Sequence, residues 1–117
     1  MATVTREFAP ADRYMYDFRI CVPSKGWAQM DTGQDASYFG NWINPITLEL
    51  FSYCEGDTTH TQCTDTEDFA VTVRKTCDWY RERDDFRGID AMMRPEIAHA
   101  FCRAGLAPYL HNDSWES

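Results

Sequence analysis

The most regular pattern along the chain is an alternation of apolar and polar residues from Arg13 to Val22. The positions that share the apolar side are Tyr14, Tyr16, Phe18, Ile20 and Val22. A repeat of two is the repeat of a β-strand, so this segment is predicted to be a half-buried strand. The sequence Pro23-Ser24-Lys25-Gly26 supplies the turn that follows it.

Further short strands are predicted between residues 27 and 63. They cover residues 27–30, 36–43, 46–53 and 58–63, with turn-forming sequences such as Asn44-Pro45 and Glu55-Gly56-Asp57 between them. Gly40 lies inside the second of these strands and suggests a bulge or a close approach to the backbone. Short connections favour antiparallel neighbours, so we expect a meander of four or five strands with residues 58–63 at its edge.

The repeat becomes helical after residue 64. Phe69, Val73, Cys77 and Tyr80 recur at helical spacing, which predicts a helix from about Asp65 to Arg83. Its start carries the spacing of a capping box, Thr64-x-x-Glu67, in which Thr64 would cap the helix.

A shorter second helix is predicted between Pro95 and Gly105, two residue types that favour the first helical position and the end of a helix. Ile97, Phe101 and Ala104 form its apolar side. Residues 84–93 read as a loop, and residues 106–110 are expected to dock against the core.

Strands followed by helices, without alternation, predict an α+β fold: an antiparallel sheet of four to five strands followed by two helices packed on it. A chain of 117 residues is large enough for one hydrophobic core. We therefore expect a flexible N-terminal arm over residues 1–12, one domain over residues 13–110 and a polar tail over residues 111–117.

The charge is distributed unevenly. The whole chain has a net charge of −8, and the stretch from Gly26 to Val73 contains no lysine or arginine. Its carboxylates are Asp31, Asp35, Glu49, Glu55, Asp57, Asp65, Glu67 and Asp68. A negative field disfavours direct binding to nucleic acid or to an anionic membrane surface, and it favours protein partners with basic surfaces. The alternative is a structural or housekeeping domain whose charge serves only solubility.

The remaining composition indicates a cytoplasmic protein without a cofactor. No apolar run approaches the roughly 18 residues that span a bilayer, and the first residues lack the layout of a signal peptide. An odd number of cysteines without framework spacing favours reduced thiols. Zinc-ligand residue types are present at Cys54, His60, Cys63 and Cys77, but they lack the paired spacing of zinc sites, so no metal site is predicted.

The segment Asp31-Thr32-Gly33-Gln34-Asp35 resembles the active-site loop of retroviral-type aspartic proteases. That resemblance implies an obligate dimer in which Asp31 is the catalytic carboxylate and two such groups share one proton. It also implies an all-β chain, which the helical pattern of residues 65–83 does not fit. An ordinary turn at this tripeptide is the other interpretation.

A longer block, from Asp31 to Asp57, resembles small uncharacterised proteins of phages and mobile elements. The segments that carry the resemblance are residues 34–40, Asn44-Pro45 and residues 53–57. The resemblance implies a small acidic inhibitor of a host defence complex, of the anti-CRISPR or anti-restriction type, which is not an enzyme. Such inhibitors occupy basic nucleic-acid-binding grooves, in some cases as nucleic-acid mimics.

These observations predict an interaction protein that contacts its partner through carboxylates and neighbouring aromatic rings. The predicted partner-binding residues are Asp31, Asp35, Glu49, Phe51, Tyr53, Glu55, Asp57, Asp65, Glu67 and Asp68. The aspartic protease that uses Asp31 is the alternative function.

Overall fold

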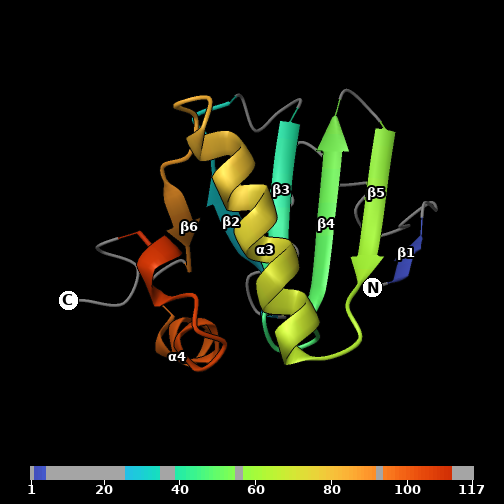
Figure 1. Cartoon of the computed structure of the whole chain (residues 1–117), viewed down its shortest axis with the longest axis vertical. Coiled ribbons are helices and arrows are strands. Elements are labelled where there is room, and N and C mark those ends of the chain that lie inside the picture. The colour runs from blue at the N-terminus through green and yellow to red at the C-terminus, as the bar shows by residue number, and fades with distance from the viewer. Residues whose placement is uncertain (1, 5–25, 35–38, 55–56, 92–93, 112–117) are drawn as a thin grey trace.

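A computed structural model describes residues 2–4, 26–34, 39–54, 57–91 and 94–111. These residues form an α+β fold with one antiparallel sheet and two α-helices (Figure 1). The predicted strand at residues 13–22 lies outside the described residues, and so do Asp35 and Glu55. None of the described helices has the length and apolarity needed to cross a membrane.

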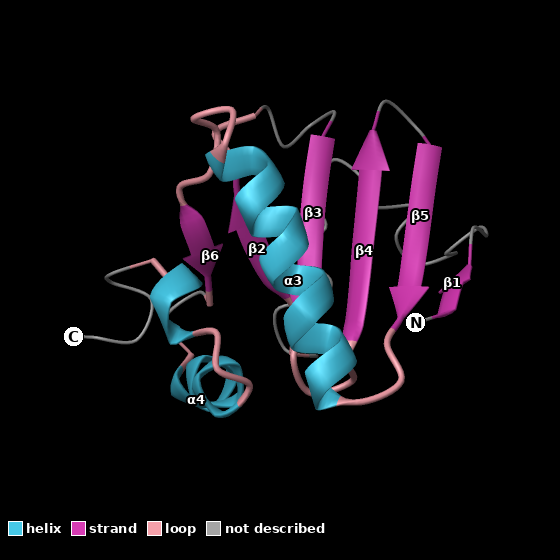
Figure 2. Cartoon of the chain, viewed as in Figure 1, coloured by secondary structure: helices cyan, strands magenta, loops and turns pink. Residues whose placement is uncertain are grey.

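The described sheet has six strands (Figure 2). In chain order they are β1 (Ala2–Val4), β2 (Ala28–Asp31), β3 (Phe39–Asn44), β4 (Glu49–Cys54), β5 (Asp57–Gln62) and β6 (Gly88–Asp90). Their order across the sheet is β1-β5-β4-β3-β2-β6, and every neighbouring pair is antiparallel. The short connections within β2 to β5 produce the meander that the sequence predicted.

Three details of the sheet differ from the sequence prediction. β5 is not an edge strand, because β1 pairs with it through Val4 and His60. β1 itself lies within residues that were expected to be a loose arm. β6 lies within the expected loop of residues 84–93, where Ile89 pairs with Met30 of β2.

Both helices pack on one face of the sheet. α3 spans Thr66–Arg81 and α4 spans Pro95–Arg103, close to their predicted bounds, and a short 3-10 turn, η2, spans Ala107–Tyr109. The core under them joins residues of β2, β3 and β6 to both helices: Ala28, Met30, Ile43, Ile89, Phe69, Val73, Ile97 and Phe101. Leu106 and Leu110 are buried too, as expected for a segment that docks on the core.

The start of α3 is capped one residue later than predicted. Asp65, not Thr64, is the N-cap, and its side chain accepts the N–H of Asp68 at 2.8 Å. The Asp68 carboxylate in turn accepts the N–H and the hydroxyl of Thr64, at 2.9 and 3.2 Å. Asp65 and Asp68 therefore take the places that the prediction gave to Thr64 and Glu67, and the Asp68 carboxylate returns to Thr64, the residue before the N-cap.

The sheet face opposite the helices is also buried. Trp42, Phe51 and Tyr53 are only 1–3% exposed. Trp42 and Phe51 are cross-strand partners, and Tyr53 follows Phe51 on the same side of β4. His60 lies beside them, 3% exposed, with its Nε2 atom 2.5 Å from the Glu49 carboxylate. The aromatic part of the predicted binding surface therefore belongs to the interior.

Gly40 is explained by the ring of Tyr53, which faces it across the β3–β4 ladder. A Cβ atom at position 40 would lie 2.5 Å from two ring carbons of Tyr53. The sequence suggested a bulge or a close approach at this glycine, and the close approach is confirmed, with a ring against the backbone.

Candidate functional site

An open groove lies beside the C-terminal end of α3. The helix crosses the sheet obliquely, so that its last turns lie away from the last residues of β4 and the first residues of β5 (Figure 1). The hollow that remains has a volume of about 420 Å³. We call it the open groove, and its lining residues are Gln34, Phe39, Gly40, Asn41, Ser52, Tyr53, Cys54, Asp57, Thr59, Trp79, Tyr80 and Asp85.

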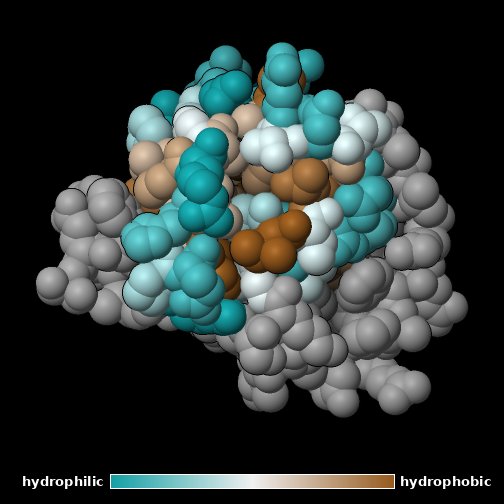
Figure 3. Space-filling view, turned by 90° about the horizontal axis from the view of Figure 1, so that it is seen from below, coloured by the Kyte–Doolittle hydropathy of each residue, from teal (hydrophilic) through white to brown (hydrophobic). Residues whose placement is uncertain are grey.

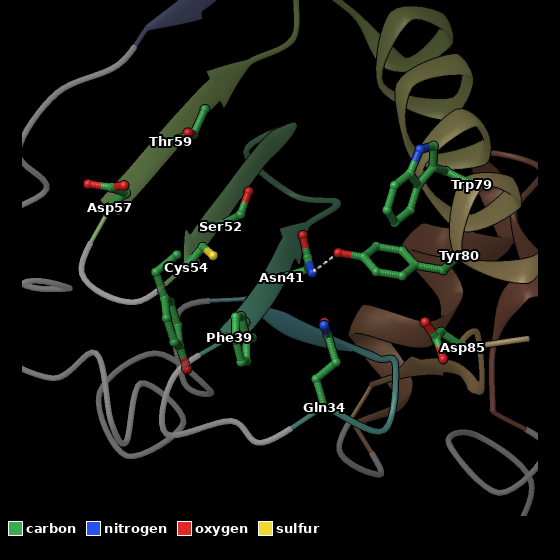
Figure 4. A pocket seen from close by; sticks show the side chains of 12 residues that line it. Gln34, Phe39, Asn41, Ser52, Cys54, Asp57, Thr59, Trp79, Tyr80 and Asp85 are labelled. Atoms are coloured by element: carbon green, nitrogen blue, oxygen red, sulfur yellow. Dashed lines mark hydrogen bonds between the residues drawn. The ribbon is translucent and has the colours of Figure 1, made fainter. Parts of the chain in front are cut away.

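The floor of the open groove is made by alternate residues of three neighbouring strands. Asn41, Ser52 and Thr59 are successive cross-strand partners and form one row. Phe39, Cys54 and Asp57 form the next row toward the strand ends. Because side chains alternate along a strand, these residues all point to the face that carries α3. The meander thus presents small polar groups in a flat array, with Phe39 and Asp57 at its two sides (Figure 4).

The helical wall consists of Trp79 and Tyr80, which reach over the floor from the last turn of α3 (Figure 4). The Tyr80 hydroxyl accepts a hydrogen bond from Asn41 Nδ2 at 2.9 Å. Trp79 is 50% exposed, although an indole is a large apolar group. An exposed aromatic ring beside a concave surface is typical of a binding site.

The Asn41–Tyr80 hydrogen bond also stands beside a smaller internal cavity of about 120 Å³. This cavity lies between α3 and the sheet and shares Asn41 and Ser52 with the open groove. Thr72 and Thr76 line it from the helix, and both hydroxyls donate to backbone carbonyls of the preceding helical turn. The helix is therefore less tightly packed near the open groove than at its start.

The open groove is acidic. Asp57 and Asp85 are exposed carboxylates on its lining, and the lining residues that the structure describes include no lysine or arginine. Two arginines, one in the last turn of α3 and one just after it, stack on aromatic rings. The Arg83 guanidinium stacks on the Trp79 ring, 3.7 Å from its centroid, and donates to the Trp79 carbonyl at 2.7 Å. Arg81 lies over the rings of Phe86 and Tyr109, 5.3 and 5.0 Å from their centroids.

This set of groups is suited to binding a cation. The described lining offers carboxylates, hydroxyls, amides, aromatic rings and the Cys54 thiol, but no imidazole or amine. General base catalysis near neutral pH usually needs such a group, or a carboxylate whose pKa is raised. Carboxylates with aromatic rings, in contrast, are the groups that attract ammonium and guanidinium ions.

The predicted acidic residues do not form one surface. Asp57 begins β5, whereas Asp65, Glu67 and Asp68 follow its end at the start of α3. Six strand residues separate the two groups by about 17 Å along the strand. Figure 3 shows the end of the molecule where α3 begins, with hydrophilic side chains around a smaller hydrophobic area. The single acidic patch expected from the sequence is therefore split between two ends of the fold.

The remaining predicted residues have local contacts. Glu49 is bonded to His60, and Phe51 and Tyr53 are core residues, so those two rings are not surface anchors as predicted. Asp68 belongs to the helix cap, and the backbone hydrogen bond from Thr64 holds the pKa of its carboxyl below the usual range. Of the predicted residues that the structure describes, Asp57 and Tyr53 line the open groove, Asp57 as an exposed carboxylate and Tyr53 as a buried residue.

Asp31 forms a turn of its own. One carboxylate oxygen accepts the N–H of Gly33 at 2.9 Å, and the other lies 3.2 Å from His111 Nε2. Gly33 has a φ of +74°, in the left-handed region that glycine adopts without strain. The carboxylate thus holds its own turn and pairs with His111 near the other end of the chain. The α+β fold differs from the all-β chain that the protease resemblance implied.

The zinc-ligand residue types are placed on different parts of the fold. His60 lies on the sheet face opposite the helices, and Cys54 is exposed in the open groove. Cys63 and Cys77 are buried free thiols in the core under α3. Burial raises the pKa of Cys77 to about 12, which keeps that thiol protonated.

Trp79, Asn41 and Asp85 were missed by the sequence interpretation. Trp79 had a signal that could have identified it, because it lies off the apolar stripe of Phe69, Val73 and Cys77 on the same helix. A large apolar residue on the polar side of a helix indicates a contact surface. Asn41 and Asp85 carry no such signal.

Comparison of the chain with protein-family models, with curated proteins and with solved structures found no match.

Proposed function

We propose that the chain is a non-enzymatic interaction protein that binds a basic surface on a partner protein through the open groove. The observation that carries this proposal is the combination of the half-exposed Trp79 with the carboxylates of Asp57 and Asp85 in one hollow without a lining cation. The net charge of −8 adds a field that accelerates encounter with a basic partner.

The partner class that fits best is a protein that handles nucleic acid. Surfaces that contact phosphates are the commonest extended arrays of lysine and arginine, so they are natural targets for an acidic protein. Binding there would block nucleic acid and make the chain an inhibitor, as in the anti-CRISPR or anti-restriction class. Carboxylates at both ends of β5 would then stand in for separate phosphates, the arrangement of a nucleic-acid mimic.

The proposal is tested by capture from a bacterial lysate with the immobilised chain. The expected result is retention of a nucleic-acid-binding protein that is released by high salt and is also displaced by added DNA or RNA. Displacement by nucleic acid is the decisive readout, because it shows that the same basic surface is used. Retention of no protein, or retention that neither salt nor nucleic acid affects, would contradict the proposal and favour a structural domain.

A further inference from the structure

We infer that the open groove is a binding site for an extended peptide segment that carries arginine. The inference rests on the proposed function, since it names the chemistry that the partner would insert. It also makes a statement about the isolated chain, which can be measured without knowing the partner.

The positions of the carboxylates indicate a segment rather than one small cation. Asp57 lies at the outer side of the floor, and Asp85 lies on the opposite side, below the helical wall (Figure 4). Phe39, Asn41 and Tyr80 lie between them in this view. One guanidinium can pair with one of the carboxylates, so occupation of both sides requires cationic groups on a connected chain that crosses the groove.

The floor between the carboxylates suits an extended backbone. Ser52 and Thr59 present hydroxyls in one row with the Asn41 amide. The Asn41 Nδ2 atom donates to Tyr80, and its Oδ1 atom is oriented away from the Tyr80 hydroxyl (Figure 4). These groups can donate to and accept from peptide groups, which gives a segment a fixed position on the floor.

Arginine is favoured over lysine because this region already binds guanidinium groups on its aromatic rings. Arg83 stacks on Trp79, and Arg81 lies over Phe86 and Tyr109, all near the C-terminal end of α3. A planar guanidinium can stack on a ring and pair with a carboxylate at the same time, which an ammonium cannot do as well.

The inference is tested by NMR titration of the isotopically labelled chain with the capped peptide Arg-Ala-Ala-Arg. We expect the Trp79 indole and Asn41 side-chain amide signals to shift, with those residues assigned from Trp79→Phe and Asn41→Asp spectra. The same peptide with citrulline in place of arginine keeps the shape and loses the charge, and it should bind at least about tenfold more weakly. A lysine peptide should bind more weakly than the arginine peptide as well.

Two variants with the same change of charge separate the groove from general electrostatics. Asp57→Asn with Asp85→Asn removes two charges from the open groove, and we expect the dissociation constant to rise at least about tenfold. Asp78→Asn with Glu96→Gln removes two exposed charges outside the groove lining, and we expect a change of less than about twofold. Unchanged backbone spectra show that each variant keeps the fold.

The inference is overturned if the citrulline peptide binds equally well, if both double variants weaken binding to the same degree, or if the arginine peptide causes no shifts at millimolar concentration. Its failure is distinguishable from failure of the proposed function. A captured partner that binds the Asp57/Asp85 variant as tightly as the parent chain would leave the proposed function standing on another surface and would refute the peptide site. Peptide binding without any captured partner would support the site and contradict the proposed function.

Discussion

The buried stripe along α3 and the last turn of the helix contact the same sheet face in different ways. Phe69, Val73 and Cys77 have no exposed surface, and the Phe69 ring lies 6.4 Å from the ring of Phe101 on α4. In the last turn, Trp79 is half exposed, and Tyr80 reaches the sheet through one hydrogen bond to Asn41. The comparison shows that α3 is anchored by its buried stripe, whereas its last turn leaves an aromatic ring exposed beside the open groove.

The largest expected difference is in thiol reactivity between the open groove and the buried stripe of α3. Cys54 is exposed in the open groove, whereas Cys77 is buried with a pKa raised to about 12 by desolvation. At pH 8 only about one Cys77 thiol in 10⁴ would be ionised, so alkylation at Cys54 should be faster by at least about 10³-fold. Time-resolved alkylation with peptide mapping by mass spectrometry measures both sites, and equal rates would contradict the separation.

Phe69→Ala tests the packed half. Removal of a fully buried ring costs transfer free energy and leaves a cavity beside Phe101, so we expect the free energy of unfolding to fall by about 3–5 kcal/mol. Chemical denaturation followed by circular dichroism gives the value. A loss below about 1 kcal/mol would mean that this half of the helix does not anchor the fold.

Asp65→Ala tests the capping register. We expect a loss of about 1 kcal/mol, because the N–H of Asp68 loses its acceptor at the helix start. Thr64→Ala is the matched comparison, since it removes only a hydroxyl that donates to Asp68 and should cost less. Denaturant titrations measure both losses of unfolding free energy. A larger loss for Thr64→Ala than for Asp65→Ala would indicate that Thr64 is the functional cap.

Tyr80→Phe tests the single hydrogen bond at the open end. The ring is retained and the acceptor for Asn41 is removed, so we expect a loss of roughly 0.5–1.5 kcal/mol. A parallel Asn41→Ala variant should show a similar loss, and the double variant should lose little more than either single one. Full additivity in the double-mutant cycle would show that the bond contributes no coupling.

Trp79→Ala should have the smallest effect on stability. Its ring is half exposed, and it lies outside the core, so we expect the free energy of unfolding to change by no more than about 0.5 kcal/mol. The same denaturant titration measures it. A loss comparable with that of Phe69→Ala would assign Trp79 to the core and remove the contrast between the two ends of α3.

The sequence predicted the elements whose periodic patterns are long. Phe69, Val73 and Cys77 mark α3 because a buried helical stripe repeats over several turns, and the alternation within β3 and β4 marks those strands. β6 was missed because three residues are too few to show a period. It forms because Met30 and Asp31 of β2 offer partners to Ile89 and Gly88, which is a tertiary effect.

The open groove could not be predicted from spacing. Its residues come from three strands, two connecting loops and the last turn of α3, and they meet only because the helix crosses the sheet obliquely. The sequence drew attention to acidic residues and assigned them to one surface, whereas the fold separates them. Asp57 and Asp65 are only eight positions apart in the sequence. The length of β5 nevertheless places them at opposite ends of that strand.

The order of the strands has a consequence for how the chain folds during synthesis. β3, β4 and β5 follow one another between residues 39 and 62, so their pairing closes only short loops and is expected to be fast. β6 pairs with β2 only after α3 has been made, and so it closes one edge of the sheet late. The three strands that form the floor of the open groove are therefore expected to pair before the ribosome has added Trp79 and Tyr80, which form its helical wall.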